Sequence, residues 1–446
     1  MAGLSPQKIA MLKTLVAASP DELVRSLEQA IGADGSSGPL AAIGAMVEAE
    51  ALERALRFAV LAPVAPLFRP KTDDDRPAFP RAALGALWLA LKADAPDMVR
   101  EATRALQYFD PDEPSPAVLD ELCACAAKGL IAQETPGYAA AVAACESARP
   151  GSSSDLILCL QMAAVARPAI LRLNDWIQRM TDERRATARL AYRDVTALAD
   201  GAGPLLFEML AAHLKQPATV LRVISAVMDH PGERYLAGSE LARFGERSLA
   251  EIENQLTLIK AMKPGAGIAA GREAGNAVQR AIEAVSELEQ AVQLSRDGPW
   301  GQRLSKLKQA IAVAVESRLK DIDDAAIHAL PMQKIRYSAK LTRTAPNLTS
   351  PPDEPAIAWA MGLLTFSDVV RPSATDGGFG TVRIKVLDGL SKRIDQYVED
   401  LLEQLRLGEV EDEARAREFL GIAANLLALA RDDKSAAIVR RRAAAA

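Results

Sequence analysis

Residues 304–322 read LSKLKQAIAVAVESRLKDI. Their apolar side chains recur every three or four positions, at Leu304, Leu307, Ile311, Val315, Leu319 and Ile322. This spacing puts them on one face of a helix, because one helical turn takes 3.6 residues. Two earlier stretches repeat the pattern, from Leu249 to Met262 and from Val278 to Val292. Breaks at Pro264-Gly265 and Gly298-Pro299 are typical of tight turns, so the sequence predicts a long antiparallel helix bundle.

Helical signals extend over the rest of the chain. Alanine, the strongest helix former, makes up about a fifth of the residues, against a typical usage nearer a tenth. Ser19-Pro20-Asp21-Glu22 has the composition of a helix start, and another apolar stripe runs from Ile384 to Leu405. We find no sustained period-two alternation, so no strand is predicted. The predicted fold class is all-α, a multi-domain helical bundle or irregular α-solenoid with the long bundle in the middle.

Proline- and glycine-rich segments suggest where domains end. They lie at 70–77, 148–154 and 345–355, and such segments cannot continue a helix. The predicted division is an N-terminal helical segment at 1–69, helical hairpins at 78–148, the long-helix bundle at 153–345 and a C-terminal helical domain at 355–446.

Composition limits the broad class of protein. A net charge of −5 among 446 residues gives no overall attraction to nucleic acid or to anionic membranes, although local patches can still provide one. Four cysteines are too few for a disulfide framework, and no long apolar run or leader is evident at the N-terminus. We therefore expect a cytoplasmic protein. Its richness in alanine and arginine is typical of a bacterial genome of high GC content.

The usual residues of catalytic and metal sites are sparse. Cys123-x-Cys125, with single cysteines elsewhere, lacks the paired spacing of a zinc site, so we interpret the cysteines as small buried side chains. The acidic run Asp321-Ile322-Asp323-Asp324 fits the hydrated side of a helix whose core residue is Ile322. The glycines at 265–271 and 377–380 fit flexible interdomain turns, because no phosphate-binding motif surrounds them. No cofactor and no catalytic residue is predicted.

One charged segment is a candidate for binding a partner. Residues 331–350 contain no acid but carry four basic residues, which we call the basic segment residues: Lys334, Arg336, Lys340 and Arg343. On a proline-bounded connector they could meet a phosphate backbone, an anionic lipid surface or an acidic protein, or they could complement acidic helices of their own chain. The three arginines at 440–442 resemble a charged tail.

These observations favour a non-catalytic helical scaffold, adaptor or regulatory protein that binds other proteins through helix faces. Two alternatives stay open. One is a helical-bundle enzyme with a site of carboxylates and arginines, and the other is a nucleic-acid or anionic-membrane binder that uses the basic segment residues. The identity of the protein partner and the existence of a homo-oligomer are not specified by the sequence.

Overall fold

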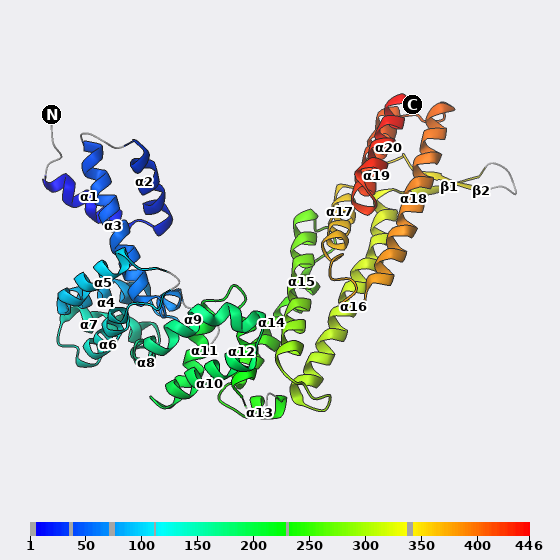
Figure 1. Ribbon diagram of the computed structural model, residues 1–446. Helices are drawn as coiled ribbons and strands as arrows, with labels where there is room; N and C mark the ends of the chain where they lie inside the picture. The colour runs from blue at the N-terminus through cyan, green and yellow to red at the C-terminus, as the bar shows by residue number, and fades with distance from the viewer. Residues whose placement is uncertain (1–5, 35–38, 71–75, 111–112, 229–231, 337–341) are drawn as a thin grey trace. The chain divides into compact units, whose positions relative to one another are not determined.

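The computed structural model describes the chain except for residues 1–5, 35–38, 71–75, 111–112, 229–231 and 337–341. Within the described residues it is helical almost throughout, and its two strands form a single short hairpin (Figure 1). The predicted all-α class is therefore confirmed. The chain folds as two compact units, Met1–Asp229 and His230–Ala446. The finer division into four domains stays a prediction.

The first unit contains twelve α-helices and two short 3₁₀ helices among its described residues. Helix α4 packs on α7, α6 on α8, and α10 on α11 and α12. The elements are α1 (Pro6–Ala18), α2 (Asp21–Asp34), α3 (Pro39–Leu61), η1 (Ala65–Leu67), α4 (Arg81–Asp94), α5 (Pro96–Gln107), α6 (Ala117–Ala132), α7 (Pro136–Ala148), α8 (Ser152–Gln161), α9 (Ala163–Gln178), α10 (Asp182–Thr196), α11 (Ala202–Ala212), η2 (Pro217–Thr219) and α12 (Val220–Val227).

A buried arginine joins three helices of this unit. Arg167 on α9 is only 6% exposed. Its guanidinium donates to the carbonyl oxygens of Ala59 and Val60 at the end of α3, both at 2.7 Å, and to Asp120 on α6, also at 2.7 Å. The last carbonyls of a helix have no partner within it, so Arg167 supplies the hydrogen bonds that α3 lacks.

The second unit is built on the three long helices that the sequence predicts. Helices α14 and α17 each pack on both α15 and α16. Helix α18 packs on α16, α19 packs on α17 and α18, and α20 packs on α19 (Figure 1). The elements are α13 (Glu233–Ala237), α14 (Ala242–Ala261), α15 (Ile268–Ala291), α16 (Pro299–Ala329), β1 (Met332–Arg336), β2 (Thr342–Pro346), α17 (Glu354–Val369), α18 (Gly380–Arg406), α19 (Glu413–Ala430) and α20 (Asp433–Ala445).

The predicted apolar stripes form the core of this unit. Every apolar position quoted from 304–322 is at most 8% exposed, and the stripe positions of α14 are equally buried: Leu249, Ile252, Leu256 and Ile259. On α15, Ile282 is half-buried whereas Val278 and Leu288 are fully buried. The helical period read from the sequence therefore identifies the faces that pack together.

Two glycines set the distance between α15 and α17. A Cβ on Gly271 would lie 2.0 Å from the carbonyl oxygen of Gly362, and a Cβ on Gly362 would lie 2.5 Å from that of Ala266. No side chain fits at these distances, so the two backbones can approach only because both residues are glycine.

A buried carboxylate anchors the start of α16. Glu233 is 2% exposed, and its side chain accepts hydrogen bonds from the backbone N–H groups of Ser295 at 2.9 Å, Trp300 at 2.6 Å and Gly301 at 3.4 Å. The N-terminus of a helix carries unpaired N–H groups and a partial positive charge, which a carboxylate satisfies. Gly298 leaves room for it, because a Cβ there would lie 2.3 Å from either carboxylate oxygen.

Three expectations from the sequence are wrong. The segment after Pro331 contains a hairpin in which β1 and β2 pair antiparallel, from Met332 opposite Pro346 to Arg336 opposite Thr342. Five-residue strands are too short for their alternation to be seen in the sequence. The glycine stretches at 265–271 and 377–380 lie between packed helices of one unit and are not interdomain turns.

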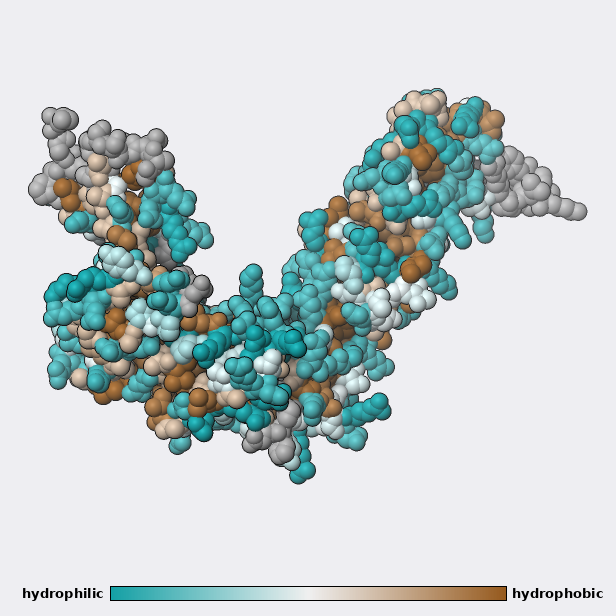
Figure 2. Space-filling model, in the orientation of Figure 1, coloured by the Kyte–Doolittle hydropathy of each residue, from teal (hydrophilic) through white to brown (hydrophobic). Residues whose placement is uncertain are grey.

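The third expectation that is wrong concerns the arginines near the C-terminus. Arg440–Arg442 belong to α20, which packs on α19, and do not form a tail. Arg442 pairs with Glu399 on α18, and Arg440 donates to Asn425 on α19 at 2.8 Å. In the view of Figure 2, the surface over α18–α20 is mostly hydrophilic with single apolar residues between, as is usual for a folded surface.

Candidate functional site

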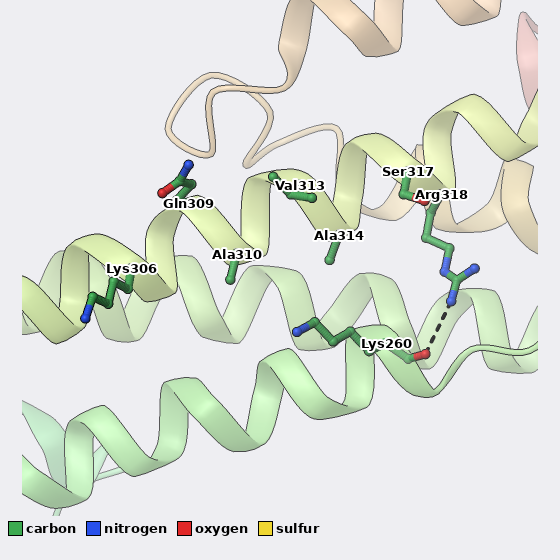
Figure 3. A pocket seen from close by; sticks show the side chains of 8 residues that line it. All are labelled: Lys260, Lys306, Gln309, Ala310, Val313, Ala314, Ser317 and Arg318. Carbon is green, nitrogen blue, oxygen red and sulfur yellow. Dashed lines mark hydrogen bonds between the residues drawn. The ribbon is translucent and has the colours of Figure 1, made fainter.

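A groove lies between the last turn of α14 and the middle of α16 (Figure 3). Its volume is about 500 Å³. Lys260 lines it from α14, and the remaining residues come from α16: Lys306, Gln309, Ala310, Val313, Ala314, Ser317 and Arg318. These α16 positions recur as neighbouring pairs once per helical turn, so they form a second face of the helix beside the buried stripe.

Small side chains keep the groove open. Figure 3 shows Ala310 and Ala314 directed toward α14 and the Lys260 side chain, where larger residues would close the gap between the helices. Val313 lies one turn from Ala310 and is 62% exposed. The groove therefore combines a floor of small residues with an exposed aliphatic side chain.

The charged groups of the groove are cations. Arg318 is engaged within the chain: it donates to the backbone oxygen of Lys260 at 3.2 Å, pairs with Asp321 at 3.2 Å and lies over the ring of Trp359, 5.9 Å from its centroid. By contrast, the ammonium groups of Lys260 and Lys306 have no ion-pair partner among the described residues. No carboxylate lines the groove.

The other two lysines of α16 are each paired with an acidic side chain. Lys308 pairs with Glu289 at 2.8 Å and Lys320 pairs with Glu316 at 3.6 Å. Among the described residues, Lys306 is thus left without an acid on a helix whose other two lysines are paired, and Lys260, on α14, has no acidic partner either. Positive charge beside an apolar floor favours an anionic, partly apolar ligand.

Three of the basic segment residues belong to the strands of the hairpin, and none of these three lines the groove. Lys334 is exposed on β1, Arg336 and Arg343 are strand residues, and Lys340 lies outside the described residues. The register pairs Arg343 with Ile335, the residue between Lys334 and Arg336. Since side chains alternate along a strand, the positions of Lys334 and Arg336 share one side of the hairpin and the position of Arg343 belongs to the other. A single binding face made of all four stays a prediction.

The sequence did not single out the groove residues, although a signal was present. Ala310, Ala314 and Ser317 are small residues at helical spacing beside two lysines, and they interrupt an otherwise polar face. The hairpin begins 14 residues after Arg318, and the part of α16 from Arg318 to its end at Ala329 is roughly 16 Å long at 1.5 Å per residue. The groove and the basic segment residues are therefore distinct features of the same unit.

Three of the four cysteines are buried, as the sequence predicts. All four are free thiols, and three of them, Cys123, Cys145 and Cys159, are fully buried. Burial raises the pKa of the Cys123 thiol to about 12 and that of Cys145 to about 11. Cys125 is partly exposed, and burial together with the hydrogen bond to Asp94 also raises its pKa. Raised values oppose formation of the reactive thiolate.

The remaining candidate features are the acidic run on α16, possible metal-binding clusters and possible membrane spans. Ile322 is 1% exposed and Asp324 is exposed, as expected, whereas Asp321 and Asp323 are partly buried and pair with Arg318 and Arg393. Among the residues that the structure describes, no group of three or more His, Cys, Asp or Glu side chains is arranged to hold a metal ion. Within the same residues no single helix is long and apolar enough to cross a membrane. Only α8 and α9 taken together, bent by 76°, reach that length and composition.

Comparison with known proteins adds no further constraint. No model of a protein family, no curated protein and no solved structure matches this chain.

Proposed function

We propose that this chain is a non-catalytic helical scaffold or adaptor whose α14–α16 groove binds an acidic, amphipathic helical segment of another protein. The observation that carries the proposal is the pair of lysines, Lys260 and Lys306, without ion-pair partners at the edge of a groove floored by small residues. A cytoplasmic location, in keeping with four free thiols, is part of the proposal.

The shape of the groove supports a helical ligand. Two helices form its walls, and a third helix laid between them can bury its apolar side chains against Ala310 and Ala314. Val313 would then be covered, which removes a largely exposed aliphatic side chain from water. Small residues at the contact allow the backbones to approach closely.

The charges support an acidic ligand. Glutamates or aspartates beside the apolar face of the incoming helix would pair with Lys260 and Lys306, whereas a basic helix would meet two like charges. The chain has a net charge of −5, so attraction of an acidic segment needs a local group of cations, which the groove offers.

The alternatives rest on weaker support. A nucleic-acid or membrane binder would use the basic segment residues, of which Lys334 is an exposed side chain in the described structure. An enzyme with a carboxylate and arginine site would need acids converging in a cavity, and the groove has none in its lining.

A peptide-binding experiment tests the proposal. The probe is a fluorescein-labelled amphipathic helix with a leucine face flanked by glutamates, and its comparison is the same peptide with lysines in place of the glutamates. Fluorescence anisotropy should show saturable binding of the acidic peptide alone, weakening as salt is raised. The double variant Lys260→Glu/Lys306→Glu should lose about tenfold in affinity, because two exposed pairs become repulsive.

The matched control makes the same change in charge elsewhere on the unit. Lys385 on α18 and Lys434 on α20 are both exposed, and Lys385→Glu/Lys434→Glu should leave binding unchanged. Equal binding of the acidic and basic peptides, or equal loss in the two double variants, would exclude the groove as the binding site.

A further inference from the structure

A second cavity lies between the end of α16, the start of β1 and the middle of α18. Its volume is about 350 Å³. Most of its lining is aliphatic or aromatic, and the complete set is Ala326, Ile327, Leu330, Met332, Arg393, Ile394, Gln396 and Tyr397. This volume and this mainly apolar lining with few polar groups are typical of small-molecule sites, at the lower end of their size range.

One polar group of the lining is unsatisfied. Tyr397 is 2% exposed, and its buried hydroxyl has no hydrogen-bond partner among the described residues. Burial raises the pKa of the Tyr397 phenol, so the hydroxyl stays protonated and can donate. A buried hydroxyl without a partner is unfavourable, so the hydroxyl gains most from a ligand that supplies an acceptor.

The charges around the cavity are already balanced. Arg393 precedes Tyr397 by one helical turn on α18, and its guanidinium lies 3.6 Å from the carboxylate of Asp323 and donates to the backbone oxygen of Asp323 at 3.3 Å. Gln396 donates to Asp400 at 2.9 Å. With Arg393 neutralised by Asp323, the cavity offers no unpaired cation to an anionic ligand, and a neutral molecule fits it best.

The solvent side of the cavity can adapt to a ligand. Met332 is 37% exposed and Ile327 is 46% exposed, so both extend to the surface while lining the cavity. Methionine is flexible and fills irregular gaps, which lets the wall at Met332 move aside when a molecule enters.

We infer that this cavity binds a small, neutral, largely apolar molecule that carries one hydrogen-bond acceptor, and that the Tyr397 hydroxyl donates to this acceptor. The apolar body of the molecule lies against Ile327, Leu330 and Ile394. The inference concerns a surface separate from the α14–α16 groove and does not depend on the function proposed for it.

Benzophenone is a suitable probe, because it is neutral and apolar, has a single carbonyl acceptor, and attaches covalently to nearby C–H bonds when irradiated. Diphenylmethane has the same two rings without the acceptor, and 4-benzoylbenzoate adds a negative charge. Calorimetric titration of the full chain should give benzophenone an affinity about two- to tenfold above that of diphenylmethane, the range for one net hydrogen bond. It should also give 4-benzoylbenzoate a lower affinity than benzophenone, and irradiation should label cavity residues such as Met332.

Three variants complete the test. Tyr397→Phe removes only the unpaired hydroxyl, so the protein should fold normally while its preference for benzophenone over diphenylmethane disappears. Ala326→Leu fills the cavity from α16 and should abolish binding of both. Tyr108→Phe, a control at a side chain 87% exposed in the other unit, should change nothing.

Several results would overturn the inference. They are equal affinities for benzophenone and diphenylmethane, a preference that survives in Tyr397→Phe, stronger binding of 4-benzoylbenzoate, and label located outside the cavity. If none of the three compounds bound saturably, the inference would be overturned as well. Because Tyr397→Phe loses no hydrogen bond, the comparison stands even if Ala326→Leu fails to fold.

Discussion

Removal of the Glu233 carboxylate should selectively loosen the start of α16. In Glu233→Ala, the buried N–H group of Trp300 and the partly buried N–H group of Ser295, which lie 2.6 and 2.9 Å from the carboxylate, lose their acceptor. A buried donor left unpaired costs about 1–3 kcal/mol and a partly buried one costs less, so we expect the free energy of unfolding to fall by about 3 kcal/mol. Glu233→Gln keeps one oxygen acceptor but loses the charge at the helix N-terminus, and should cost about 2 kcal/mol.

Gly298 gives an independent perturbation of the same contact. A Cβ at this position would lie 2.3 Å from the carboxylate oxygens, so Gly298→Ala should displace the Glu233 side chain without removing its charge. Because both substitutions break one interaction, the double variant Glu233→Ala/Gly298→Ala should lose clearly less stability than the sum of the two single variants.

Hydrogen exchange followed by mass spectrometry is the appropriate assay, because a chain of two units need not unfold in one step. Peptides covering 295–310 should exchange faster in both single variants, while peptides from the first unit stay unchanged. The reasoning would be refuted if Glu233→Ala lowered the free energy of opening at 295–310 by less than about 1 kcal/mol. It would also be refuted if the losses of the two single variants simply added in the double variant.

Three further predictions concern other parts of the chain. Gly271→Ala should destabilise the second unit by about 2 kcal/mol, because the new methyl group meets the backbone oxygen of Gly362. Gly389→Ala on α18, where nothing lies within 4 Å of the new methyl group, should instead stabilise the unit by about 0.5–1 kcal/mol, and thermal melting of both variants measures the two effects. Thiol titration of the native protein should find at most one accessible cysteine, Cys125. Raising the pH from 7 to 9 should expose no further reactive thiol, because the buried thiols have raised pKa values. Four fast-reacting thiols would contradict this prediction. Replacing all four basic segment residues with glutamine should leave the melting temperature within about 2 °C and the binding of the acidic peptide unchanged, because the peptide is expected to pair with Lys260 and Lys306 instead.

The helices of the second unit could be predicted because their information is local. Each apolar stripe, such as the one in 304–322, repeats within a single helix, and burial of the stripe decides how the helix packs. Turn residues at Pro264-Gly265 and Gly298-Pro299 then mark where consecutive helices reverse.

Contacts between distant positions could not be predicted in this way. Arg167 completes hydrogen bonds of Ala59 and Val60 more than a hundred residues earlier, and Glu233 anchors Trp300, 67 residues later. Nothing in the local sequence of either residue distinguishes it from a solvated charge. Only the folded chain brings these partners together.

The candidate site was missed for a related reason. A lysine at 260 or 306 is ordinary in a helix, and its lack of an acidic partner becomes visible only when α14 and α16 lie side by side. The basic segment residues drew attention because four charges without an acid are visible in sequence, whereas their pairing in a hairpin of five-residue strands is not.

Photocrosslinking from within the groove tests the central claim most directly. A benzoylphenylalanine at Val313, which is 62% exposed, would be irradiated in cells of the host, and the attached segment would be identified by mass spectrometry. The account predicts an acidic amphipathic segment of another protein, captured equally well by Lys385→Glu/Lys434→Glu and lost in Lys260→Glu/Lys306→Glu. Capture of a second copy of this chain, of a basic or non-helical segment, or of the same segment after reversal of both groove lysines would contradict it.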